Sequence, residues 1–319
     1  MKPIGGYFEL ELAKGEQNYH EDALALKSGR AAMLYIIQKL KPSKFYVPYY
    51  TCDGLIDPIV DSGVKFEFYS IDDKLEAKSL PTLKVGEYFI YVNYFDLKRH
   101  YTRKLSEELG DKLIVDCTQA FFMKGNGRSW FFNSCRKYFG TPDGSHLYAP
   151  DGIDISESFE PNEEYTTDHL VSRFNGDARK GYESFLKNEQ LCGIGLKAIS
   201  KLSEYLLSHI NYESIIQSRR ENFQHLQSLF DEYYLSNSET DNEAVPMFYP
   251  VYREQTINTQ KLSEQNLFIP TFWADVLNRK ADGFVFEEKL TNHLLPLPID
   301  HRYAKGDMDY LARAIKNLK

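Results

Sequence analysis

A lysine and an aspartate on neighbouring segments are the residues best suited to chemistry. Lys137 lies in the stretch Asn133–Gly144, and Asp116 follows the apolar residues Ile114 and Val115. An amine can hold pyridoxal phosphate (PLP) as a Schiff base, and a carboxylate can keep its pyridine nitrogen protonated, so that the ring acts as an electron sink. Together the two residues suggest a PLP site. Taken alone, such a pair is more often a strand-end cap and a solvated surface amine.

The surrounding residues resemble motifs of the DegT/DnrJ/EryC1/StrS family of PLP-dependent sugar aminotransferases. In the family motif that resembles Asp116-Cys117-Thr118-Gln119-Ala120, the Asp pairs with the pyridine nitrogen and the Gln lies against the phenolic oxygen. Lys137, followed by a glycine-bearing turn, stands where the family forms its Schiff base. Ser134 stands where a serine holds the cofactor phosphate. The resemblance therefore implies catalytic roles for Lys137 and Asp116 and cofactor contacts for Gln119 and Ser134.

Two earlier segments extend the resemblance. Gly29 and Arg30 open a helical pattern, and a helix N-terminus offers free amides and a positive dipole end to a phosphate. Family members use this turn in their phosphate site and mostly carry a small hydroxyl residue at the place of Arg30. Its guanidinium is expected either to contact the phosphate or to pair with a surface carboxylate.

The resemblance also implies a residue that stacks on the cofactor ring. Family members often place an aromatic side chain there, and the aligned position in this chain falls between Tyr50 and Cys52. The alternative is that these residues only pack at the end of a strand. Other similar segments are Val92–Phe95 and Leu297–Tyr303.

Composition narrows the class of protein. The 319 residues include 38 basic and 46 acidic ones, and the net charge of -8 argues against a non-specific nucleic-acid binder. The N-terminal residues lack the apolar core of a signal peptide, and no apolar run approaches membrane-spanning length, so a cytoplasmic protein is expected. The four cysteines lack paired spacing, so neither a zinc site nor a disulfide framework is indicated, and no metal is expected.

Short apolar runs that alternate with helical stretches predict an α/β domain with a largely parallel sheet. Ligands of such sheets bind beyond the carboxyl ends of the strands, which is where the strand 112–116 places Asp116. The resemblance implies PLP-dependent transferase fold type I, the aspartate aminotransferase-like fold. We expect an N-terminal segment 1–19, a large cofactor-binding domain 20–205 and a small C-terminal α/β domain 206–319. The predicted strands are 44–48, 64–69, 87–92, 112–116, 129–132 and 146–149, and residues 53–62 form a helix with Pro58 inside it.

The C-terminal part shows helical periodicity followed by strand-like runs. Apolar stripes from Leu202 to Phe230 are typical of core seams, and Arg219 falls within one of them. The polar stretch 236–243 reads as a surface loop and 247–252 as a strand. A last helix is expected to begin with Asp307 as its N-cap.

These inferences predict an aminotransferase. An amino acid such as glutamate would give its amino group through the Lys137 Schiff base, and the keto group of a nucleotide-linked sugar would accept it, as in amino-sugar biosynthesis. The resemblance also implies a homodimer, because the family completes its site at the subunit interface.

Three alternatives stay open. Related dehydratases keep the cofactor but replace the lysine with histidine, and Lys137 argues against that branch. A degenerate or regulatory paralogue is possible because the chain is shorter than typical members and departs from their pattern at Arg30, Asp96 and Ser145. The third is a nucleotide-sugar binding or glycosyl-transferring α/β protein that uses no PLP.

Overall fold

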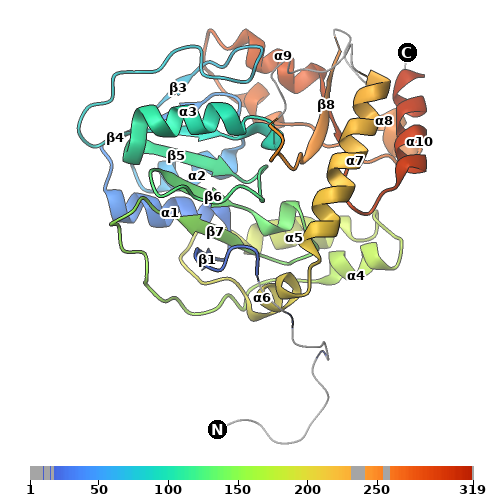
Figure 1. Ribbon diagram of the computed structural model, residues 1–319, viewed down its shortest axis with the longest axis horizontal. Helices are drawn as coiled ribbons and strands as arrows, with labels where there is room; N and C mark the ends of the chain where they lie inside the picture. Colours follow the sequence, from blue (N-terminus) through green and yellow to red (C-terminus); the bar gives the residue numbers. More distant parts are fainter. Residues whose placement is uncertain (1–9, 11–14, 16–17, 231–240, 254–258, 318–319) are drawn as a thin grey trace, which may run out of the picture.

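A seven-stranded sheet is the centre of the protein (Figure 1). The structure is a computed structural model that describes residues 10, 15, 18–230, 241–253 and 259–317. The strand order is β1-β7-β6-β5-β4-β2-β3. The five strands β2 to β6 run parallel, whereas β7 is antiparallel to β6 and β1 is antiparallel to β7. The strands are β1 (Leu24–Leu26), β2 (Lys44–Pro48), β3 (Lys65–Tyr69), β4 (Glu87–Val92), β5 (Leu113–Cys117), β6 (Trp130–Asn133) and β7 (Ser145–Tyr148).

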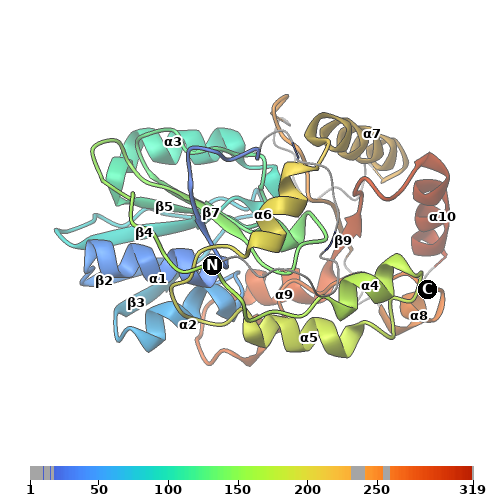
Figure 2. The same cartoon turned by 90° about the horizontal axis from the view of Figure 1, so that it is seen from below.

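Burial explains why the central strands carry so few polar residues. All five residues of β5 and all four of β6 are buried, as expected for parallel strands covered on both faces. Figure 2 shows α3 (Arg99–Leu109) on one side of the sheet, with α1 (Gly29–Leu40) and α2 (Asp53–Asp61) on the other. The carboxyl ends of β4, β5 and β6 therefore share one edge, and the loops that follow them meet there.

A smaller unit follows in the C-terminal part. β8 (Phe248–Tyr252) pairs antiparallel with β9 (Leu294–Pro298), and α7 (Tyr212–Phe230) and α10 (Lys305–Lys316) pack together beside them (Figure 1). The remaining helices of this part are α8 (Thr259–Glu264) and α9 (Val285–His293). The predicted domain boundary at 205/206 falls inside α6 (Lys201–Ser208), and its placement stays a prediction.

Two helices run between the larger and the smaller unit. α4 (Asp168–Phe174) and α5 (Tyr182–Leu191) lie along one side of the molecule and reach toward α8 and α10 (Figure 2). Arg173 and Arg179 join this segment to the smaller unit, because they donate to the Tyr303 hydroxyl at 3.4 Å and to the Ser263 carbonyl at 2.8 Å. The helices therefore form part of the wall between the two units.

The predicted fold class is confirmed, and each predicted strand of the large sheet is present to within one residue at either end. β1 was missed, because a three-residue strand gives almost no periodicity. The prediction for the last helix was wrong in its start. α10 begins at Lys305 after Ala304, and Asp307 is its third residue, whose carboxylate accepts from the Ala304 amide at 2.9 Å. Of the predicted loop 236–243, residues 236–240 lie outside the described residues.

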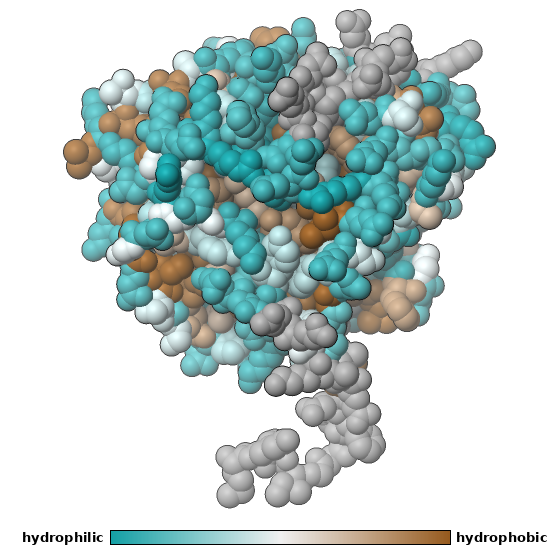
Figure 3. Space-filling model, in the orientation of Figure 1, coloured by the Kyte–Doolittle hydropathy of each residue, from teal (hydrophilic) through white to brown (hydrophobic). Residues whose placement is uncertain are grey.

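The surface and the helices add two observations. Hydrophilic residues dominate the face seen in Figure 3, where hydrophobic residues form small separate patches. In the described part of the chain, none of the helices has the length and apolarity that crossing a bilayer would require.

Candidate active site

Lys137 and Asp116 meet at the carboxyl edge of the sheet, with Thr118 between them. Asp116 is the fourth residue of β5 and is 3% exposed, whereas Lys137 is an exposed residue at the end of a short 3-10 helix (Cys135–Lys137) after β6. The Lys137 amine donates to the Thr118 hydroxyl at 3.1 Å, and the Thr118 amide donates to the Asp116 carboxylate at 2.8 Å. The amine and the carboxylate are 21 positions apart in sequence, and both are hydrogen-bonded to Thr118.

The environment of Asp116 favours contact with a protonated group. Burial raises the pKa of the Asp116 carboxyl, while the nearby Lys137 amine and the hydrogen bonds from Thr118 act in the opposite direction. Burial likewise raises the pKa of the Cys52 thiol, on which Lys137 and Asp116 also act. Cys52, the N-cap of α2, therefore lies in the same electrostatic field as the two charged groups.

The Gln119 side chain has a buried N–H donor without a hydrogen-bond acceptor in the described part of the chain. Its side-chain oxygen accepts from the Phe95 amide at 3.1 Å, and its backbone oxygen accepts from the Tyr138 hydroxyl at 2.6 Å. Its Nε2 atom is buried and has no hydrogen-bond partner among the described residues. Because buried polar groups are nearly always paired, this donor indicates a ligand acceptor at the site.

The N-terminus of α1 lies directly beside Thr118. A Cβ atom on Gly29 would come within 3.3 Å of the Thr118 Cγ2 atom, so the backbone packs closely here. Ser28 caps the helix through its own hydroxyl, which accepts from the Ala31 amide at 3.2 Å. Ser134 is buried at the end of β6, three residues before Lys137. This arrangement brings a helix N-terminus to the predicted phosphate position.

Arg30 occupies a position between two carboxylates. Its guanidinium lies 3.9 Å from Asp57 of α2 and 3.9 Å from Glu189 of α5. The other oxygen of Glu189 pairs with Arg136, next to Lys137 in the chain. Arg136, Arg30 and Lys137 hold the pKa of Glu189 below its usual value, against the effect of burial. An anion, here the Glu189 carboxylate, is thus already held beside the turn that carries Lys137.

Tyr50 is placed differently from Cys52. Its hydroxyl donates to the Phe272 carbonyl at 2.6 Å, and the residue is fully buried. Its ring lies 4.9 Å from that of Trp273 and 5.8 Å from that of Tyr94. Protein neighbours therefore surround the Tyr50 ring, and which residue contacts a cofactor ring stays a prediction.

A cavity of about 860 Å³ opens beside Lys137. Its wall comes from the turn of Lys137, the segment of α4 and α5, helix α7 and the smaller unit. Five basic and two acidic side chains line it, together with apolar residues such as Phe248 and Leu267. The charged residues are Lys137, Arg173, Arg179, Arg219, Arg302, Asp300 and Asp307.

Neither a family model nor a curated protein sequence matches the chain significantly. Solved structures do match it over almost its whole length. A DegT DnrJ EryC1 StrS aminotransferase from Brucella abortus aligns over 92% of this chain and 85% of its own, with a TM-score of 0.60 and 16% identity. A protein of Streptococcus pneumoniae assigned as a sugar aminotransferase, in its PLP form, aligns over 96% and 93%, with a TM-score of 0.63 and 12% identity. A GDP-4-keto-6-deoxymannose-3-dehydratase variant with bound GDP-perosamine aligns over 92% and 88%, with a TM-score of 0.63 and 14% identity.

The chain has the fold of PLP-dependent sugar aminotransferases. The first of these neighbours carries the name of the family that the sequence motifs resemble, so motif and fold agree. Identities of 12–16% establish the fold and leave the activity to be argued from the site.

Sequence reasoning missed three residues of this site. Thr118 lies inside the recognised motif, yet no role was predicted for it. Glu189 gave no signal, since a single acidic residue on a polar helix is ordinary. Arg219 did give one, because an arginine within an apolar stripe must be buried with its charge.

Proposed function

We propose that this protein is a PLP-dependent aminotransferase. It moves an amino group from an amino acid such as glutamate to the keto group of a nucleotide-linked sugar. The observation that carries the proposal is the Lys137 amine beside Thr118, with the buried Asp116 carboxylate bonded to the same residue. The fold of the aminotransferases in which this arrangement lies supports it.

The residues present fit PLP. Asp116 is a buried carboxylate suited to a protonated pyridine nitrogen. The Gln119 Nε2 donor, which has no partner among the described residues, suits a phenolic oxygen. The N-terminus of α1 at Gly29 and the guanidinium of Arg30 suit a phosphate, and the buried Ser134 is a further candidate ligand. Cys52, on whose thiol Lys137 and Asp116 act electrostatically, is a candidate for contact with the cofactor ring.

When bound, PLP supplies the electron sink that lowers the barrier to losing a proton from the donor's α-carbon. Lys137 would hold the cofactor covalently through Nζ and, once released by the donor amine, would move that proton. Thr118 accepts a hydrogen bond from Nζ and so orients it. Asp116 would hold a proton at the pyridine nitrogen, and its burial strengthens that contact, because the interior has a low effective dielectric constant.

The cavity beside Lys137 supports an anionic acceptor. Its volume is within the range of small-molecule sites, and its charged lining is mainly basic. These properties suit a nucleotide-linked sugar, whose phosphates carry negative charge. From the resemblance to the sugar aminotransferase family, we also infer that the protein is a homodimer and acts in amino-sugar biosynthesis.

The visible spectrum of the purified protein with added PLP tests the proposal. We expect a yellow band that bleaches on addition of glutamate or another amino donor, and no such band in Lys137→Ala. Lys104→Ala, which removes an exposed lysine of α3, is the matched control and should keep the band. A colourless wild-type protein under every condition would contradict the proposal and favour a binding or glycosyl-transfer role. A band that no amino donor bleaches would favour a degenerate or regulatory paralogue.

A further inference from the structure

The segment 49–54, which runs from the end of β2 into α2, lies along the predicted cofactor site. It carries Cys52, whose thiol lies in the electrostatic field of Lys137. Two residues further on, Gly54 packs against the predicted phosphate ligand Arg30, because a Cβ atom on Gly54 would come within 3.0 Å of the Arg30 Nη2 atom. A small displacement of this segment would therefore move groups on both the ring side and the phosphate side of the site.

The smaller unit holds this segment through Arg279. The Nη2 atom of this arginine donates to the Thr51 carbonyl at 2.8 Å and to the Asp53 carboxylate at 2.6 Å, and these two residues stand on either side of Cys52. Its Nη1 atom donates to the Tyr49 carbonyl. The Arg279 side chain is 10% exposed, so the guanidinium is largely shielded from water and its hydrogen bonds are strengthened. One side chain of the smaller unit thus binds three acceptors of one short segment.

The same part of the smaller unit also caps α2. Cys52 is the N-cap of this helix, and in the described part of the chain its side chain makes no capping hydrogen bond. The Asp275 carboxylate supplies an acceptor instead, because it accepts from the Asp53 amide at 3.1 Å. Since the first amides of a helix need acceptors, the start of α2 depends in part on the turn Ala274–Asn278, which ends next to Arg279.

A thiol at the cofactor ring needs such support more than an aromatic side chain would. An aromatic ring buries a large area and is held by its own contacts, whereas a cysteine buries little and its sulfur follows the backbone. The backbone around Cys52 is held by hydrogen bonds to both of its neighbours from the same guanidinium.

We propose that Arg279 is a positioning residue that holds Cys52 in place at the cofactor ring. Arg279 does not line the cavity beside Lys137, and it acts through the segment 49–54. The role at the ring rests on the proposed function, whereas the hold on the segment can be measured on the protein without PLP.

Alkylation of the cysteines with iodoacetamide, followed by mass spectrometry of the peptides, tests this hold on the cofactor-free protein. Cys52 is partly exposed, whereas the other three cysteines are buried and react only when the fold opens. In Arg279→Gln, we expect Cys52 to react about 10-fold faster, because hydrogen bonds from a charged donor no longer oppose local opening. The other three cysteines should remain unmodified over the same period. One common rate for all four cysteines, or an unchanged rate at Cys52, would overturn the proposal.

Two further variants assign the effect to the guanidinium. Lys280→Gln removes the charge of the next residue, which is exposed, and its Cys52 should react at the wild-type rate. Arg279→Lys keeps the charge but lacks the planar fork, and we expect it to recover part of the protection. If Cys52 reacted as fast in Lys280→Gln as in Arg279→Gln, a general effect of surface charge would explain the result and the proposal would be wrong.

A double-mutant cycle on PLP affinity measures the link to the cofactor. Fluorescence titration gives the Kd of PLP for the wild type, Arg279→Gln, Cys52→Ala and the variant with both changes. We expect Arg279→Gln to weaken PLP binding about 3- to 10-fold, and to have a clearly smaller effect once Cys52 is alanine, because the two changes act through one contact. Additive effects, or wild-type affinity in Arg279→Gln, would overturn the role at the ring.

The two measurements fail independently of each other. A wild-type protein that binds no PLP would contradict the proposed function and with it the role at the ring, while the alkylation rates would still decide whether Arg279 holds the segment. Normal PLP binding together with an unchanged alkylation rate in Arg279→Gln would leave the proposed function intact and overturn the positioning role.

Discussion

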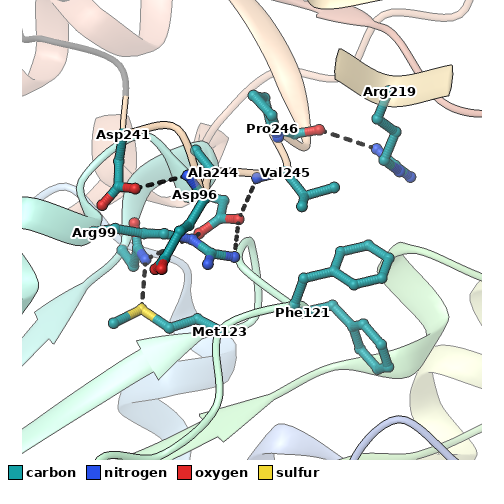
Figure 4. A network of polar contacts seen from close by, with 12 residues as sticks. Asp96, Arg99, Phe121, Met123, Arg219, Asp241, Ala244, Val245 and Pro246 are labelled. Carbon is teal, nitrogen blue, oxygen red and sulfur yellow. Dashed lines mark hydrogen bonds and ion pairs between the residues drawn. The ribbon is translucent and has the colours of Figure 1, made fainter. Parts of the chain in front are cut away.

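Two buried aspartates lie at the carboxyl ends of the adjacent strands β4 and β5, and their charges are paired to different degrees. Asp96 follows β4 and is completely buried, and Arg99 grips both of its oxygens at 2.7 Å. The Val245 amide adds a third contact at 2.8 Å (Figure 4). Asp116, at the end of β5, is 3% exposed and accepts from the amide of Thr118, with the Lys137 amine nearby.

The difference separates a structural carboxylate from a chemical one. The charge of Asp96 is matched by a guanidinium that is itself buried, and although burial acts to lower it, the facing carboxylate raises the pKa of Arg99. Among the residues that the structure describes, Asp116 has no such guanidinium partner, so its charge remains available to a ligand. A buried pair that is saturated holds the fold together, whereas one that is left partly free can serve a reaction.

The largest expected effect follows from removing the charge of Asp116. Asp116→Asn keeps the size of the side chain, and we expect the rate of the half-reaction with glutamate to fall roughly 100- to 10,000-fold. The free energy of unfolding should change by less than about 1 kcal/mol, because the asparagine oxygen can still accept from the Thr118 amide while a desolvated charge is removed. Single-turnover spectra and urea unfolding measure the two quantities. Normal turnover in this variant would remove Asp116 from the chemistry.

Asp96→Asn should show the reverse pattern. Asparagine tolerates the left-handed backbone at this position, where φ is 60°, so the substitution changes mainly the charge. Arg99 then loses its carboxylate in the interior, and we expect a loss of about 3–5 kcal/mol in the free energy of unfolding. The rate per folded molecule should stay near the wild-type value. A stability loss below about 1 kcal/mol would mean that water or another group replaces the carboxylate.

Two buried histidines extend the comparison to groups kept neutral. His20 and His146 stack at 4.8 Å behind the Lys137 turn, and burial lowers the pKa of both, that of His146 to about 4. Between pH 6.5 and about 4 the unfolded chain binds protons that the folded chain does not, so stability falls as the pH falls. The expected slope is about 1.4 kcal/mol per pH unit for each histidine. Urea unfolding between pH 7 and 5 measures it, and His146→Gln should reduce the slope by about half. A slope that His146→Gln leaves unchanged would assign the effect to other groups.

The local parts of the site were readable from the sequence. Asp116 ends an apolar run, and a buried strand places its last residues at the ligand edge of a parallel sheet. The helix that starts at Gly29 was predictable for the same reason, since capping and periodicity are local properties.

The residues that form the walls of the cavity could not be predicted from the sequence. Arg219 reaches Tyr138 across 81 positions, and Glu189 reaches Arg136 across 53, so neither spacing is marked in the sequence. Such contacts depend on how α5 and α7 pack against the sheet edge. Asp307 illustrates a smaller failure, because an aspartate is favourable both as an N-cap and at the third position of a helix.

The smallest expected effect concerns Glu189. Its charge is paired less completely than that of Asp96 but more completely than that of Asp116. It pairs with Arg136 and lies 3.9 Å from Arg30, but its side chain is 33% exposed. If its carboxylate occupies the place of a cofactor phosphate, Glu189→Gln removes a competing anion, and PLP should bind about 2- to 5-fold more tightly, as expected for a partly exposed ion pair. If Glu189 instead holds the two arginines in position, the same change should weaken PLP binding. Fluorescence titration with PLP decides by the sign of the change, with Glu183→Gln on the exposed face of α5 as the control. Tighter binding would show that a carboxylate from α5 and the cofactor phosphate compete for the same arginines. The Glu189 side chain would then have to move away from these arginines when PLP binds.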